Sequence, residues 1–295
     1  MKIAIIGANS YIARNVIFSF ENSEDKIILY DIQETHIDNR KNYKSVNITD
    51  KESVKNIDFD CNIIYIFAGK TGTSIGFSQY DSFLDINEKG LLNILNEYVE
   101  QKSKAKIIFP STRLVYKGSE TPLKEDDEKE FKTIYAINKY ACEQYLKMYN
   151  NMYNIPYCIF RICVPYGTMI KDASSYGTAE FMLNKAKNGD NITLYGKGEV
   201  RRTFTNMKDL TRALILGAKS CKCLNDIYNI GGENYSLSET AKQIAAKYKV
   251  NIEYIDYPEA ALKIESGSTV FNSDKFDKLL NFEYQNTFKN WIGEQ

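Results

Sequence analysis

The stretch that decides the fold is Lys2-Ile3-Ala4-Ile5-Ile6-Gly7-Ala8-Asn9-Ser10-Tyr11-Ile12-Ala13. It holds a short, continuously apolar run, a glycine turn and the start of a helical pattern, and a continuous apolar run is typical of a parallel strand covered on both faces. After the first strand of a doubly wound sheet, such a turn sets the free N–H groups of a helix against a dinucleotide pyrophosphate. The stretch therefore predicts a strand, turn and helix that bind a dinucleotide.

The rest of the first half continues this alternation. Apolar runs at 27–30, 62–67, 106–109 and 157–161 predict further strands, and helical patterns cover 11–21, 81–102 and 133–153. Strands that alternate with helices of this length are typical of βαβ units. We predict an α/β, Rossmann-type, doubly wound parallel sheet.

After about residue 165 the pattern becomes irregular. A helical segment near 178–188 and strand-like pieces near 192–195 and 252–257 lie among loops rich in Gly, Ser and Thr. We expect a smaller, interleaved C-terminal substrate lobe. The predicted division gives 1–165, plus roughly 205–230, to the dinucleotide-binding domain, and 166–204 and 231–295 to the substrate lobe.

The composition limits the partners. Thirty-eight basic side chains balance thirty-eight acidic ones, so the chain lacks the net positive field that holds nucleic acid. The N-terminal run is interrupted by polar residues and does not resemble a signal peptide, and later apolar runs are too short to span a membrane. The six cysteines show no zinc spacing and His36 is the only histidine. We expect a cytoplasmic protein with reduced thiols and no metal site.

Two further features bear on the dinucleotide site. Ser10 and Ala13 stand where glycines usually occur in this turn, and both are small enough for close backbone approach. Asp31 follows the second apolar run, where a carboxylate can accept hydrogen bonds from both hydroxyls of an adenosine ribose and would repel a 2′-phosphate. This favours NAD(H). Arg14 could favour a phosphate, so NADP(H) remains an alternative.

A second group of polar residues follows a later strand. Thr112 comes after the run at 106–109, and Tyr135 and Lys139 lie one helical turn apart on one face. We expect the Lys139 ammonium to lower the pKa of the Tyr135 phenol, which makes it an acid or base near neutrality. Tyr98 and Lys102 have the same spacing but lack a preceding pair of hydroxyl residues, and we interpret them as a solvated helix face.

With these motifs in place, nearly the whole chain resembles the extended short-chain dehydrogenase/reductase family that modifies nucleotide sugars. Ser111-Thr112-x-x-Val115-Tyr116 resembles its Ser-Ser/Thr-x-x-Val-Tyr segment, and Asn47-Ile48-Thr49-Asp50 its adenine loop. Leu194 to Phe204 resembles its Gly-x-Gly-x-x-x-Arg-Asp-Phe stretch, and Tyr228-Asn229-Ile230-Gly231-Gly232 the strand and turn that follow. Ala68-Gly69-Lys70-Thr71-Gly72 resembles a loop of GDP-fucose synthases.

The resemblance implies a role for each candidate residue. Thr112, Tyr135 and Lys139 would be catalytic. The expected cofactor-binding residues are Gly7, Asn9, Ser10, Tyr11, Ile12, Asp31, Ile32, Asn47, Ile48, Ala68, Gly69, Tyr135 and Lys139. The expected substrate-binding residues are Lys70, Thr112, Arg113, Tyr135 and Arg202, and Arg202 would grip the sugar-nucleotide pyrophosphate. The resemblance also implies a homodimer through the helices at 81–102 and 133–153.

Departures from the family pattern narrow the reaction. Arg113 and Leu114 replace the Asp-Glu pair that drives elimination in 4,6-dehydratases, and the usual Asn is Val164. Because these replacements make dehydration improbable, the reaction that we expect is hydride transfer at C4 of the sugar. We expect a reductase of a nucleotide-4-keto-6-deoxy sugar; the alternatives are a 4-epimerase that retains NAD and a non-catalytic, dinucleotide-sensing module.

Overall fold

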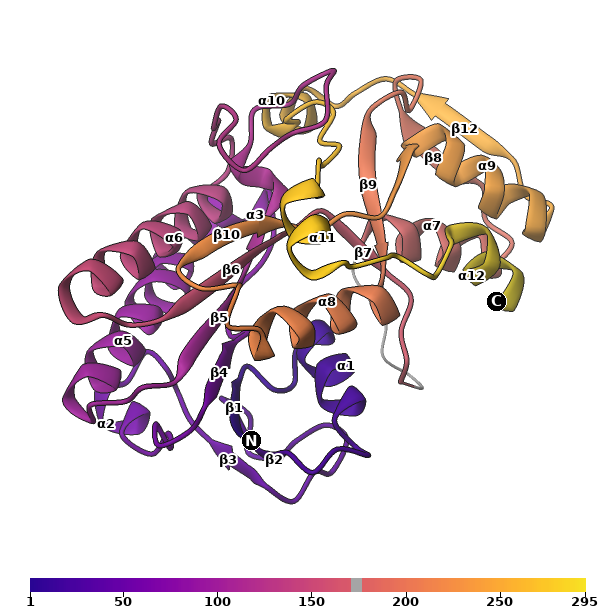
Figure 1. Ribbon diagram of the computed structural model, residues 1–295. Coiled ribbons are helices and arrows are strands. Elements are labelled where there is room, and N and C mark those ends of the chain that lie inside the picture. Colours follow the sequence, from indigo (N-terminus) through magenta and orange to yellow (C-terminus); the bar gives the residue numbers. More distant parts are fainter. Residues whose placement is uncertain (171–176) are drawn as a thin grey trace.

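The computed structural model describes residues 1–170 and 177–295. Its main sheet is parallel throughout and has the strand order β10-β6-β5-β4-β1-β2-β3 (Figure 1). The strands are β1 (Lys2–Ile6), β2 (Lys26–Asp31), β3 (Tyr43–Ser45), β4 (Ile63–Ile66), β5 (Lys106–Thr112), β6 (Tyr157–Ile162) and β10 (Asp226–Asn229). Chain order runs outward in opposite directions from β1, so the sheet is doubly wound as predicted. Its switch point lies between β1 and β4, where such sheets bind ligands.

Helices cover both faces of this sheet, which explains why its strands are apolar throughout. One face carries α1 (Tyr11–Ser19), α8 (Met207–Lys219) and α11 (Asp274–Leu280). The other carries α2 (Lys51–Val54), α5 (Gly90–Glu100) and α6 (Ile134–Tyr153) (Figure 1). Each face encloses its own buried apolar cluster, and α11 reaches the first of them through Phe276.

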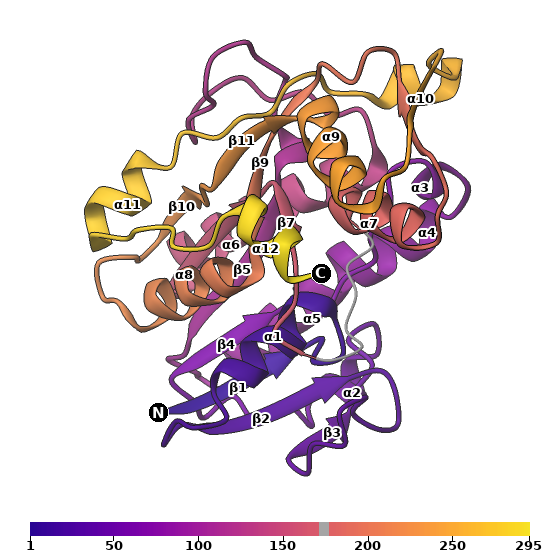
Figure 2. The same ribbon diagram turned by 90° about the vertical axis from the view of Figure 1, so that its right-hand side faces the viewer.

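The smaller lobe contains two short sheets and lies beyond the carboxyl ends of the main strands (Figure 2). β7 (Val164–Tyr166), β9 (Arg201–Asn206) and β11 (Glu233–Ser236) form one, and β8 (Ile192–Tyr195) and β12 (Ile252–Ile255) the other. Its helices are α7 (Thr178–Lys187), α9 (Leu237–Tyr248), α10 (Glu259–Ile264) and α12 (Phe288–Glu294). The chain leaves this lobe to form α8 and β10 and then returns. α11 lies against the main sheet, although the predicted division gives its residues to the lobe.

The predicted helix over 81–102 is not uniform. α3 (Ile75–Ser78) and α4 (Tyr80–Phe83) precede a π-helical segment, η1 (Leu84–Lys89), which continues into α5. Within η1, the Asn87 carbonyl accepts a hydrogen bond from the Cys142 thiol at 3.1 Å, and the Asn87 side chain bonds the backbone of Lys70. These contacts from α6 and the β4 loop fix the widened turn, a conformation that is frequent near functional sites. Across the described residues, every helix is too short or too polar to cross a bilayer.

Candidate active site

A cavity of about 460 Å³ opens at the carboxyl ends of β1, β2 and β4. Nine of the thirteen predicted cofactor residues line it: Gly7, Asn9, Ser10, Asp31, Ile32, Asn47, Ile48, Ala68 and Gly69. Lys70 lines it as well. Tyr11 and Ile12 instead pack their side chains against the apolar cluster beneath α1. The structure therefore gathers most of the predicted cofactor residues around one cavity at the switch point.

Gly7 allows the turn after β1 to approach β4. Its φ of +86° lies in the left-handed region, and a Cβ there would stand 2.2 Å from the Ala68 backbone nitrogen. A side chain cannot fit at that distance, so the turn requires glycine. The other two glycines of the usual motif are dispensable here, because Ser10 and Ala13 fit the space they have.

Asp31 presents both carboxylate oxygens at the edge of the cavity. Oδ2 accepts the Asn9 backbone N–H at 2.8 Å, and Oδ1 accepts the Ile32 backbone N–H at the same distance. Each oxygen keeps a lone pair for a ribose hydroxyl. Arg14, the residue that could have favoured a phosphate, forms a two-point ion pair with Asp38 at 2.6 and 2.9 Å. The carboxylate therefore determines the charge at this end of the cavity.

Ser10 provides a direct test of whether a dinucleotide fits. It is the N-cap of α1, yet its side chain makes no capping hydrogen bond. Its hydroxyl is buried and lacks a hydrogen-bond partner among the described residues. The first turn of a helix also leaves backbone N–H groups unpaired, and these bind phosphate. An orphan donor at a helix N-terminus inside this cavity fits the pyrophosphate of NAD.

Replacing Asp31 by alanine is expected to weaken NADH binding about 10- to 100-fold, because two charge-assisted hydrogen bonds are lost. NADPH binding should strengthen relative to NADH, since the repulsion of a 2′-phosphate is also removed. Fluorescence titration of both nucleotides measures the ratio. Asp60→Asn is the matched control, because Asp60 is fully exposed. An unchanged ratio would mean that Asp31 does not contact the ribose.

The predicted catalytic residues come from β5 and α6. Thr112 is the last residue of β5, and Tyr135 and Lys139 lie on the first two turns of α6, which Thr133 caps by accepting the Ala136 N–H at 3.1 Å. Lys139 donates to the Pro110 carbonyl at 2.8 Å, and its ammonium lies 4.3 Å from the centre of the Phe109 ring. This contact fixes the start of α6 against the end of β5, the strand that carries Thr112.

Burial shifts the pKa of both members of the Tyr135 and Lys139 pair. It lowers the pKa of Lys139 to about 8 and raises the pKa of Tyr135 well above its usual value. The expectation that Lys139 lowers the pKa of Tyr135 is therefore wrong for this structure. The physical reason is desolvation, which disfavours the phenolate, while the Lys139 ammonium is directed to the Pro110 carbonyl.

The pair at Tyr98 and Lys102 also differs from expectation. Tyr98 is not on a solvated face: it is only 3% exposed and donates to the Ala105 carbonyl at 2.9 Å. Burial raises its pKa to about 12. The tyrosine ties the end of α5 to the start of β5, so the second Tyr-x-x-x-Lys motif has a structural role.

A second cavity, of about 570 Å³, lies between the carboxyl end of β5 and the smaller lobe. Arg113 and Leu114 line it next to Thr112, and α7 contributes Phe181 and Lys185 on the opposite side. Lys185 is held by Thr193 at 3.1 Å. Spacing alone could not single out these α7 residues, because any amphipathic helix shows it. We call this the substrate cavity.

Arg202 lies behind the wall of the substrate cavity. It is 2% exposed, pairs with Glu265 at 2.5 Å, and donates to the carbonyls of Arg201 and Gly267. Arg113 contacts Ser266 at 3.2 Å and faces the cavity. Burial and the neighbouring Arg202 lower the pKa of Arg113 to about 10. Arg113 is thus open to a ligand in the substrate cavity. Arg202 could contact a ligand only after its ion pair with Glu265 breaks.

Sequence reasoning missed a buried polar network below Thr112. Ser111 donates to Glu143 at 2.5 Å, and Glu143 pairs with Arg161 at 2.6 Å. Arg161 also donates to the Tyr116 hydroxyl at 2.7 Å. Glu143 follows Lys139 by four residues, so it lies on the Tyr135 face of α6, and that spacing is the signal that could have found it.

Comparison with known proteins agrees with this arrangement. A putative UDP-glucose 4-epimerase from Methanocaldococcus jannaschii is 27% identical over 80% of this chain and 79% of its own length. A dTDP-4-dehydro-6-deoxyglucose reductase from Escherichia coli is 29% identical over 79% and 66%. The solved structure of UDP-glucose 4-epimerase from Thermus thermophilus superposes with a TM-score of 0.86 at 20% identity, covering 99% of this chain and 96% of that one.

The family model named NAD dependent epimerase/dehydratase family matches residues 3–231, which include the whole lining of the dinucleotide cavity and the predicted catalytic residues. The matched range includes the Gly7 turn, Asp31, Thr112 and the Tyr135 and Lys139 pair. The chain is therefore an NAD-dependent enzyme that belongs to the NAD dependent epimerase/dehydratase family.

Proposed function

We propose that this enzyme uses NADH to reduce the C4 ketone of a nucleotide-4-keto-6-deoxy sugar. The observation that carries the proposal is the arrangement of Thr112 at the end of β5 with Tyr135 and Lys139 on one face of α6, where partial burial raises the pKa of the Tyr135 phenol and keeps it protonated. A ketone reduction needs a proton donor at the carbonyl oxygen, and a protonated phenol is one. Oxidation of an alcohol needs the phenolate, which burial disfavours.

In this mechanism the ketone oxygen lies near Thr112 and Tyr135. The Thr112 hydroxyl donates a hydrogen bond to that oxygen and orients the carbonyl. Bound NADH supplies the hydride to C4. Tyr135 gives its proton to the oxygen, which yields the C4 alcohol, and then regains a proton from solvent. The Lys139 ammonium keeps Tyr135 in position, because its hydrogen bond to the Pro110 carbonyl holds the start of α6 against the end of β5.

The substrate cavity supports a nucleotide-linked sugar. Arg113 and Lys185 offer two cations to a diphosphate, and Phe181 and Tyr195 offer aromatic surface to a base. The substitution of Arg113 and Leu114 for the acid pair of dehydratases supports reduction without loss of water. The likeness to the E. coli dTDP-4-dehydro-6-deoxyglucose reductase, at 29% identity, supports the 4-keto-6-deoxy class.

A 4-epimerase that retains NAD is the second candidate, favoured by the likeness to the M. jannaschii protein over a similar length. One experiment separates the two: mass spectrometry of the nucleotide that co-purifies with the protein, followed by NADH oxidation against a panel of nucleotide-4-keto-6-deoxy sugars. Stoichiometric NADH oxidation on one sugar supports the reductase. Retained NAD and C4 interconversion without NADH consumption would establish the epimerase.

The initial rate of reduction should be constant below about pH 7 and should fall as pH rises through about 8. In the folded protein Lys139 loses its proton near that value, while Tyr135 stays protonated, so the alkaline limb reports the loss of the ammonium. A pH profile of kcat with saturating NADH measures it. A reduction rate that rises between pH 7 and 9 would contradict the assignment of Tyr135 as the acid.

We also propose a homodimer formed through η1 and α6. Leu84, Ile137, Met148 and Met152 are between 44% and 73% exposed on these elements, and an apolar surface of this kind needs cover. Met148→Glu should shift the protein from dimer to monomer in light scattering after gel filtration. A parent protein that is already monomeric would exclude this interface.

The free state of all six cysteines supports a cytoplasmic location.

A further inference from the structure

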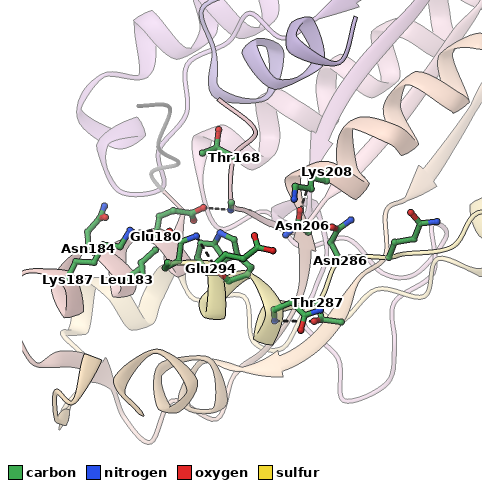
Figure 3. A pocket seen from close by; sticks show the side chains of 15 residues that line it. Thr168, Glu180, Leu183, Asn184, Lys187, Asn206, Lys208, Asn286, Thr287 and Glu294 are labelled. Atoms are coloured by element: carbon green, nitrogen blue, oxygen red, sulfur yellow. Dashed lines mark hydrogen bonds between the residues drawn. The ribbon is translucent and has the colours of Figure 1, made fainter. Parts of the chain in front are cut away.

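A third cavity, of about 270 Å³, lies in the smaller lobe between α7, α12 and the start of α8 (Figure 3). α7 separates it from the substrate cavity. Glu180, Leu183, Asn184 and Lys187 point into the third cavity, whereas Thr178, Phe181, Met182 and Lys185 line the substrate cavity. Each set follows helical spacing along one face. A molecule in the third cavity is therefore separate from the substrate.

Glu180 leaves an unsatisfied polar atom at this cavity. Glu180 is only 6% exposed. One of its carboxylate oxygens, Oε1, accepts a hydrogen bond from the Gly167 N–H at 2.5 Å (Figure 3). The other oxygen, Oε2, is buried without a hydrogen-bond partner among the residues that the structure describes. Buried acceptors are almost always paired, so Oε2 calls for a donor. Burial raises the pKa of Glu180 to about 7, in accord with this missing donor.

The wall of the third cavity has no net charge and is rich in amides. Glu180 and Glu294 balance Lys187 and Lys208, so the lining residues give no overall attraction to an anion or a cation. Six lining side chains are amides: Asn184, Asn206, Gln285, Asn286, Asn290 and Gln295. Asn206, Asn286 and Gln295 use part of their hydrogen-bonding capacity within the protein. Amides both donate and accept hydrogen bonds, as hydroxyl groups do, so the remaining capacity of the wall suits a ligand with several hydroxyls.

The volume limits the size of the ligand. At about 270 Å³ the cavity is smaller than the ~300–1,000 Å³ of typical ligand sites, and too small for a nucleotide sugar. We propose that it binds one neutral, polyhydroxylated molecule the size of a monosaccharide, with a hydroxyl that donates to Oε2 of Glu180. This site is independent of the proposed reaction, since it lies on the other face of α7.

The test is calorimetric titration of the full chain with free D-glucose, D-galactose and D-mannose, and with ethanolamine as an ammonium probe. We expect saturable binding of at least one monosaccharide. Glu180→Met should weaken it about tenfold or more, because the carboxyl oxygen that accepts the ligand hydroxyl is lost. Asn290→Ala should weaken it severalfold while the bond between Glu180 and Gly167 stays intact, which covers the case in which Glu180→Met fails to fold.

Two controls make the result decisive. Glu283→Gln changes an exposed carboxylate elsewhere on the surface, and Lys185→Met changes the substrate face of α7; neither should alter monosaccharide binding. Monosaccharide binding that Lys185→Met abolishes, and that Glu180→Met and Asn290→Ala leave unchanged, would place the sugar in the substrate cavity and overturn the proposal. Saturable binding of ethanolamine alone, or of no probe, would also overturn it.

Discussion

Tyr135→Phe is expected to lower kcat for keto-sugar reduction about 10²- to 10⁴-fold, the range over which a positioned acid accelerates proton transfer. The phenylalanine ring keeps the packing at the start of α6 and removes only the hydroxyl that donates to the C4 oxygen. The affinity for NADH should change little, because Tyr135 lies outside the lining of the dinucleotide cavity. Stopped-flow absorbance of NADH oxidation gives kcat, and fluorescence titration gives the affinity.

Tyr98→Phe is the matched control for this experiment. It removes a hydroxyl from the other Tyr-x-x-x-Lys motif, where the phenol donates to the Ala105 carbonyl. Loss of that buried hydrogen bond should cost about 1 kcal/mol of stability and leave kcat unchanged. If Tyr135→Phe retains full turnover, Tyr135 is not the acid.

Glu143→Leu is expected to lower the free energy of unfolding by about 3–5 kcal/mol, because it leaves the Arg161 guanidinium charged, buried and without its carboxylate. The side chains of Arg161 and Glu143 are 2% and 0% exposed, so solvent cannot replace the missing partner. The Ser111 hydroxyl also loses its acceptor, next to Thr112. Urea unfolding followed by circular dichroism measures the change.

Glu259→Gln serves as the comparison for that measurement. Glu259 pairs with Lys263 on α10, where both side chains are at least 70% exposed, so its loss should change stability by less than about 0.5 kcal/mol. In the double variant Glu143→Leu with Arg161→Met, the loss should be smaller than the sum of the two single losses, since no unpaired charge remains. Additive losses would show that the pair is not coupled.

The sequence determined those features that depend on short spacing along the chain. Continuous apolar runs predicted the parallel strands, because burial on both faces removes any alternation. The glycine directly after the first apolar run predicted the turn at Gly7. The position of Asp31 after the second run predicted its place at the cofactor site, and the four-residue spacing of Tyr135 and Lys139 predicted that they share one helix face. In each case the signal and the structure that it predicts lie within one strand, one turn or one helix.

Other features depend on contacts between distant segments, and only the tertiary structure decided them. Burial, not Lys139, controls the pKa of Tyr135, and desolvation depends on everything packed around α6. Glu265 covers Arg202 from a loop 63 residues away, which no motif in either segment records. The same holds for the two faces of α7 and for the orphan oxygen of Glu180. A sequence specifies which groups can ionise or hydrogen-bond, whereas the fold decides which of them meet and which are removed from water.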